Sequence, residues 1–268
     1  MTIRRHSLVN ALKLITSDDP EKISMGLEWF KEHIPGLEGE DYRQALQAVA
    51  SVFTHDTYES PQYQGVVNEA VKVLVSQGEL CIPYLLEMLA DSDFKVEFNL
   101  AVVLGKMGSA SVKPLMEAYQ HSRHPAEKAF ILYALGKISH DRISEAIPLM
   151  LAALDDSDRE VRDSAARSLG KISEVIGPDK VPEDQRNEIF AKLLPKTRDE
   201  YSGVRSKAIR SLGKLSQNNF LTDEQKHELQ TSLVEMLGKS GDFVWDSAFI
   251  VRREAEAVYK QLTGNEEV

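Results

Sequence analysis

The stretch from Ala146 to Ser173 reads AIPLMLAALDDSDREVRDSAARSLGKIS and decides the fold of the chain. Its first half places apolar residues at helical spacing around Pro148, and proline suits the first turn of a helix. The polar run 155–158 then interrupts the spacing, because Asp and Ser favour turns and helix N-caps. The second half forms one apolar stripe at helical spacing, made of Val161, Ala165, Leu169 and Ile172. This pattern predicts a helix, a tight turn and a second helix.

The same unit recurs along the chain, marked by the triplet Leu-Gly-Lys. The four glycines of these triplets are 31, 34 and 43 residues apart, and they are Gly105, Gly136, Gly170 and Gly213. Three of them follow a proline by 22 residues, the prolines being Pro83, Pro114 and Pro148. Tandem units of this kind bury their apolar faces against their neighbours. We therefore predict an all-α fold, a right-handed α-solenoid of about seven helical hairpins.

The quality of the repeat predicts the organisation of the chain. Residues 81–216 hold well-formed repeats, residues 1–80 hold two divergent copies, and residues 217–268 hold a degenerate copy that acts as a C-terminal cap. Together they predict a single solenoid over residues 1–268. Glycine inside a helix costs ~1 kcal/mol relative to alanine. Its recurrence in the second helix of the unit therefore predicts close backbone packing or an early helix end.

Composition narrows the class of protein. The chain carries 42 acidic and 32 basic side chains, a net charge of −10, which argues against a general nucleic-acid binder. Cys81 is the one cysteine, so no internal disulfide can form, and we expect it to be buried and inert. No stretch has the 18 consecutive apolar residues of a membrane span. We expect a cytoplasmic protein that needs no cofactor.

The residues from Ile147 to Ile172 follow the pattern IPxLxxxLxDxDxxVRxxAAxxLGxI, which resembles the HEAT-like repeat of the type also found in phycobilisome lyases. The resemblance extends from Cys81 onward. It implies a curved adaptor that lines a concave face with its second helices. It also implies a ladder of arginine and aspartate between neighbouring repeats. We accordingly expect Arg162 and Arg205 to be structural, paired with Asp158 and Asp199, and the ladder to be interrupted around residues 97 to 128.

A row of basic residues is the first candidate for partner binding. Lys106, Lys137, Lys171 and Lys214 occupy one repeat position, and one helical turn earlier stand Tyr133, Arg167 and Arg210. Equivalent positions align along a solenoid, so the row predicts a basic stripe that binds an acidic segment of a protein or peptide. The alternative is a variable, solvated position that happens to hold lysine.

Two aromatic features add candidates. Phe130 and Tyr133, with Phe98, predict either an aromatic patch for a peptide or a larger core in the middle repeats. The segment 238–247 is longer than a tight turn and carries Phe243, Val244 and Trp245. It predicts either a partner contact through Trp245 or a terminal cap covered by these aromatic side chains.

No catalytic, metal or cofactor residues are predicted. The sequence has no Gly-rich phosphate loop and no serine elbow, and His121 and His124 lie in a turn without an acid triad. A non-enzymatic scaffold or adaptor is the function that we expect. The resemblance leaves two alternatives open, a bilin lyase-like protein that handles a chromophore and a DNA glycosylase of the HEAT-like class.

Overall fold

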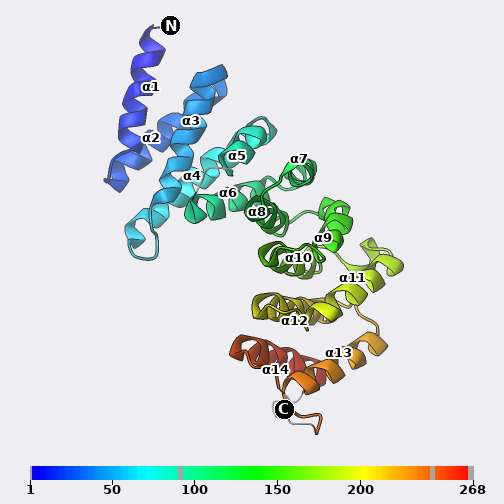
Figure 1. The fold of residues 1–268 in the computed structure, drawn as a ribbon. Helices are drawn as coiled ribbons and strands as arrows, with labels where there is room; N and C mark the ends of the chain where they lie inside the picture. The colour runs from blue at the N-terminus through cyan, green and yellow to red at the C-terminus, as the bar shows by residue number, and fades with distance from the viewer. Residues whose placement is uncertain (1, 90–92, 242–244, 265–268) are drawn as a thin grey trace. The chain divides into compact units, whose positions relative to one another are not determined.

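The computed structural model describes residues 2–89, 93–241 and 245–264 (Figure 1). Over these residues the chain forms 14 α-helices and no strand, with one isolated bridge between Leu237 and Trp245. The helices follow one another as seven pairs, so the all-α class and the predicted number of hairpins are confirmed. The chain divides into two compact units, Met1–Ala118 and Tyr119–Val268, with the division inside α7 (Ser109–His121).

The first unit holds three helical pairs. Its helices are α1 (Thr2–Ile15), α2 (Pro20–His33), α3 (Gly39–Ser51), α4 (Gln64–Ser76), α5 (Ile82–Leu89) and α6 (Phe94–Met107). The second helices pack in a row, because α2 contacts α4 and α4 contacts α6. Cys81 precedes α5 and is buried, and burial raises the pKa of its thiol to about 12. This agrees with the inert role expected of it.

The second unit repeats the arrangement of paired helices. Its helices after α7 are α8 (Pro125–Leu135), α9 (Ile147–Ala153), α10 (Arg159–Ile172), α11 (Glu183–Lys196), α12 (Ser202–Gln217), α13 (Asp223–Met236) and α14 (Phe249–Thr263). Figure 1 shows α8, α10, α12 and α14 stacked side by side, with α9, α11 and α13 on the other side of the stack. We call the outward side of the four stacked helices the second-helix face.

The local signals read from residues 146–173 are present in the structure. Pro148 lies in the first turn of α9, and the carboxylate of Asp158 caps α10 by accepting from the backbone N–H groups of Glu160 and Val161. The predicted stripe on α10 is buried, since Val161, Ala165, Leu169 and Ile172 are at most 1% exposed. This stripe and its equivalents form the core between the two helix layers.

The repeated glycines mark the closest contacts between neighbouring second helices. A Cβ atom on Gly170 would lie 2.7 Å from the backbone Cα of Ser211, and one on Gly136 would lie 3.3 Å from the Cα of Ser168. On Gly213 it would meet a methyl carbon of Val258 at 2.6 Å. Close packing of the neighbouring helix therefore accounts for Gly170, against backbone, and for Gly213, against a side chain, while Gly136 is also the residue at which α8 ends. In each case the contacted residue lies two positions before the equivalent position of the next repeat.

Candidate functional site

A cluster on α8 and α10 lies at the centre of the predicted basic row. The guanidinium of Arg167 lies 4.6 Å from the ring centroid of Tyr133, and the ammonium of Lys137 lies 5.1 Å from the same centroid. Both cations are within the range of cation–π attraction. Across the described residues, Arg167 forms no ion pair and no hydrogen bond from its guanidinium to a carboxylate. The cluster therefore combines an aromatic surface with a guanidinium able to receive an anion.

Three other cations of the row are paired with carboxylates of the same face. Arg210 on α12 forms two hydrogen bonds with Glu254 on α14. Lys171 and Lys214 share Glu174, at 2.5 and 2.8 Å. These pairs neutralise much of the stripe that the sequence predicts. They also single out Arg167, because the equivalent arginine in the next repeat, Arg210, has its carboxylate within the chain.

The local electrostatics follow from partial burial. Burial acts to raise the pKa of Glu174, but hydrogen bonds from Lys171 and Lys214 outweigh it and leave the pKa lowered. Burial raises the pKa of Asp163 on α10, although Lys207 lies 3.9 Å away and Arg167 and Arg210 are near. The carboxylate of Asp163 consequently offsets only part of the positive charge around Arg167.

The remaining predicted residues lie elsewhere. Lys106 is exposed on α6 and belongs to the first unit. Phe130 is only 8% exposed and packs beside Tyr133, with ring centroids 6.0 Å apart, so it contributes to the core. Trp245 is 65% exposed and therefore does not close a terminal cap. Phe243 and Val244 lie outside the described residues.

The turns of the second unit carry an arginine ladder, defined as Arg162 with Asp199 and Arg205 with Asp246. Each pair is two-pronged, at 2.8 and 3.0 Å for the first and 2.6 and 2.8 Å for the second. The ladder was expected from the resemblance, but the predicted partners were wrong by one repeat. Asp158 instead caps α10, and Asp199 offers Arg205 only its backbone carbonyl.

The ladder is interrupted where the sequence predicts. Glu97 and Lys128 occupy the positions of Arg162 in two earlier repeats. Neither forms an ion pair with any residue in the described ranges, and Lys128 lies over the ring of Tyr119 instead, 5.3 Å from its centroid. Within the described ranges, the ladder is therefore confined to the last three repeats.

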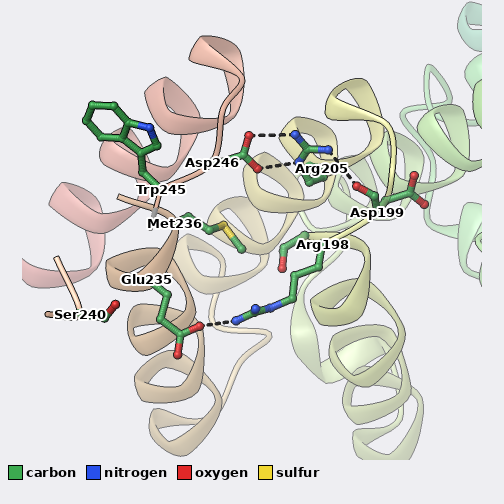
Figure 2. Close-up of a pocket in the computed structure, with 9 residues that line it drawn as sticks. Arg198, Asp199, Arg205, Glu235, Met236, Ser240, Trp245 and Asp246 are labelled. Atoms are coloured by element: carbon green, nitrogen blue, oxygen red, sulfur yellow. Dashed lines mark hydrogen bonds and ion pairs between the residues drawn. The ribbon is translucent and has the colours of Figure 1, made fainter. Parts of the chain in front are cut away.

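A groove of about 640 Å³ runs along the turns between the last two helical pairs. Figure 2 shows Arg205 with Asp246 and Arg198 with Glu235 on its walls, and Trp245 pointing away from the Arg205–Asp246 pair. The charged groups that line the groove are thus occupied with one another. We assign the groove to the packing of neighbouring repeats.

The ladder makes the unfolding free energy depend on pH. Burial acts to raise the pKa of Asp199 and of Asp246, but hydrogen bonds from Arg162 and Arg205 outweigh it and leave both pKa values below 3.8. A lowered folded-state pKa gives stability that is complete above the unfolded pKa and is lost as the pH falls through the folded one.

The urea midpoint should therefore drop as the pH falls below about 4. The Asp199→Asn, Asp246→Asn double variant should have a lower free energy of unfolding at pH 7 and should lose less of it on acidification. The same dependence of the urea midpoint on pH in the variant and in the wild type would contradict this.

Comparisons with known proteins agree with this architecture. A family model of HEAT repeats matches residues 112–184. A chain of the Kap95:Nup1 complex is similar, with 15% identity and a TM-score of 0.60, over 97% of this chain and 36% of that chain. A chain from a structure of Kap95p with RanGDP has 13% identity and a TM-score of 0.58, over 97% and 36%. A designed armadillo repeat protein has 14% identity and a TM-score of 0.49, over 88% and 100%.

The HEAT-repeat match and the two similarities to Kap95 chains establish the fold as an all-helical repeat, with HEAT repeats over residues 112–184. Comparison with curated protein sequences gave no match. Within the described part of the chain, no helix combines the length and apolar character that crossing a bilayer requires. Nor do the described residues include three His, Cys, Asp or Glu side chains grouped so as to hold a metal ion.

Proposed function

We propose that the chain is a non-enzymatic scaffold that binds an acidic segment of a protein or peptide on the second-helix face, centred on Arg167. The observation that carries the proposal is the contrast between Arg167 and Arg210. Both occupy one repeat position, yet among the residues that the structure describes only Arg210 has a carboxylate on its guanidinium. A carboxylate from a partner would give Arg167 the arrangement that Glu254 gives Arg210.

The residues around Arg167 favour a peptide ligand over a small inorganic anion. Tyr133 supplies an aromatic surface beside Arg167, and Lys137 adds a second cation to the same ring. Aromatic residues and arginine are the side chains that most often anchor protein interfaces. A peptide with an acidic residue next to an apolar one would match this combination of charge and aromatic surface.

The two alternatives lack a comparable supporting observation. A HEAT-like glycosylase needs a strongly basic face, whereas Glu174 and Glu254 pair with three of the five cations of the row in the second unit. The bilin lyase-like alternative depends on the resemblance alone. Neither alternative accounts for the contrast between Arg167 and Arg210, and the scaffold proposal does.

The proposal predicts that Arg167→Ala weakens peptide binding. We expect fluorescein-labelled peptides with Asp or Glu beside an apolar residue to bind the full chain, measured by fluorescence anisotropy. Loss of a charge-assisted hydrogen bond costs ~1.5–3 kcal/mol, so the dissociation constant should rise at least about tenfold. Added salt should weaken the binding of the wild-type chain as well.

Arg123→Ala is the control for this experiment, because Arg123 is an exposed arginine in the turn between α7 and α8. It removes the same charge from the chain, and its binding constants should equal those of the wild type. The proposal is wrong if no acidic peptide binds, or if Arg123→Ala and Arg167→Ala weaken the binding equally.

A further inference from the structure

Three turns of the second unit share one arrangement of arginine and aspartate. In each turn an aspartate accepts a hydrogen bond from the backbone N–H two residues later. An arginine six residues after the aspartate donates to two backbone carbonyls of the same turn, at 2.6 to 3.1 Å. The three pairs are Asp156 with Arg162, Asp199 with Arg205, and Asp246 with Arg252. The turn thus fixes the orientation of its own arginine.

In the first two turns, the other edge of the guanidinium receives a carboxylate from the following turn. Arg162 receives Asp199 and Arg205 receives Asp246, both in the two-pronged geometry. Arg252 is held by its own carbonyls in the same way. Yet no carboxylate among the residues that the structure describes lies within ion-pair distance of it. The arrangement at Arg252 therefore matches the other two, except that the second edge of its guanidinium has no carboxylate from a described residue.

The surface around Arg252 includes exposed apolar side chains. The ring of Trp245 lies 5.2 Å from the Arg252 guanidinium, and this side chain is 65% exposed. Phe249 and Ile250, at the start of α14, are 68% and 38% exposed. Their equivalents in an earlier repeat are Arg159 and Glu160.

In that earlier repeat, the residue equivalent to Phe249 contacts the following turn. Arg159 lies 5.1 Å from the ring centroid of Tyr201, and Tyr201 belongs to the turn whose Asp199 pairs with Arg162. The position of Phe249 is thus one against which the following turn packs, and Ile250 is its neighbour in sequence. Apolar residues there favour an apolar or aromatic side chain in that turn.

We propose that Arg252, with Trp245, Phe249 and Ile250, is a docking site for an acidic turn of a partner protein. The matching ligand is an aspartate that closes its own turn and is followed by an aromatic residue, as Asp199 is followed by Tyr201. The aspartate would make a two-pronged contact with Arg252, and the aromatic ring would cover the apolar rim. This site is separate from Arg167 and does not depend on the function proposed for that face.

A cyclised peptide with the sequence of residues 197–203, TRDEYSG, is the probe. Trp29 and Trp245 are the two tryptophans of the chain, so a Trp29→Phe variant identifies the indole N–H signal of Trp245 by nuclear magnetic resonance. We expect the peptide at about 1 mM to shift this signal and the Nε–H signal of Arg252. The same peptide with Asp199→Asn should shift neither, because it lacks the carboxylate.

Variants of the full chain separate the proposal from its competitors. Arg252→Ala should weaken binding at least about tenfold, and Arg252→Lys should also weaken it, because lysine cannot make the two-pronged contact. Arg253→Ala and Arg167→Ala should leave it unchanged. Far-UV circular dichroism checks that each variant is folded.

Equal binding of the Asp and Asn peptides, or no binding to the wild type, would overturn the site. If the wild type self-associates and Arg252→Ala abolishes this self-association, the site binds a second copy of the chain. That result would overturn the partner proposed here.

Discussion

Replacing Arg162 with alanine should lower the free energy of unfolding by ~3–5 kcal/mol, the range measured when one partner of a buried ion pair is removed. The side chains of Arg162 and Asp199 are each only 7% exposed. Without the guanidinium, Asp199 keeps a backbone hydrogen bond from Tyr201 but loses its cation. Its charge then remains in a site from which water is largely excluded, and this desolvation is the main source of the loss. Urea denaturation followed by circular dichroism measures the effect.

Arg252→Ala is a matched control for this prediction. Arg252 makes the same two hydrogen bonds to its own turn but has no carboxylate among the described residues. Its replacement should cost only ~1–2 kcal/mol, the contribution of hydrogen bonds to partly exposed carbonyls. The difference between the two variants isolates the pair with Asp199. Equal losses would show that the turn, and not the contact between repeats, provides the stability.

The register of the ladder shows where sequence reasoning stops. The Val-Arg pairs and the turn aspartates are visible in the sequence, and so is the interruption at Glu97 and Lys128. Spacing does not say whether Arg162 reaches the aspartate of its own turn or that of the next. The structure resolves this, because Asp158 is used as an N-cap and Asp199 lies one repeat further along the stack. Helix capping competed with ladder formation for the same residue type.

The candidate site was predicted only in part. The alignment of Tyr133, Arg167 and Arg210 follows from the repeat register, which the sequence displays directly. The neutralisation of the row does not, because Glu254 lies 44 residues from Arg210 and acts only through the stacking of α12 on α14. The pairing of Glu174 does have a signal in the sequence, since Glu174 follows Lys171 by three residues, a helical neighbour spacing.

Burial separates two aromatic candidates that the sequence treats alike. Phe130 and Tyr133 lie three residues apart on α8, yet the ring of Phe130 packs into the core while Tyr133 lies under the guanidinium of Arg167. Periodicity assigns both to neighbouring positions of one helix surface. It does not give the direction of a neighbouring helix, which decides what is covered. Contacts between repeats therefore limited the prediction of the site more than contacts within them.

The same contacts between repeats make Gly170→Ala the second large prediction. A Cβ atom there would lie 2.7 Å from the Cα of Ser211 and 2.5 Å from its Cβ, distances that real packing does not tolerate. Since the obstacle includes backbone, rotation of a side chain cannot relieve it, and α10 and α12 must move apart. Overpacking typically costs about 1–3 kcal/mol, and we expect a loss near ~3 kcal/mol in spite of the better helix propensity of alanine.

Two further variants test the cause of this loss. Gly65→Ala, at an exposed position near the start of α4 where a Cβ would meet nothing within 4 Å, should change the unfolding free energy by less than about 0.5 kcal/mol. Adding Ser211→Gly to Gly170→Ala should recover part of the loss, because it removes the Cβ and hydroxyl obstacles but not the Cα. Full recovery would mean that the backbones are not in contact. No recovery would mean that Gly170 is needed for a reason other than the approach of α10 to α12, and the explanation of the repeated Leu-Gly-Lys triplet would have to be replaced.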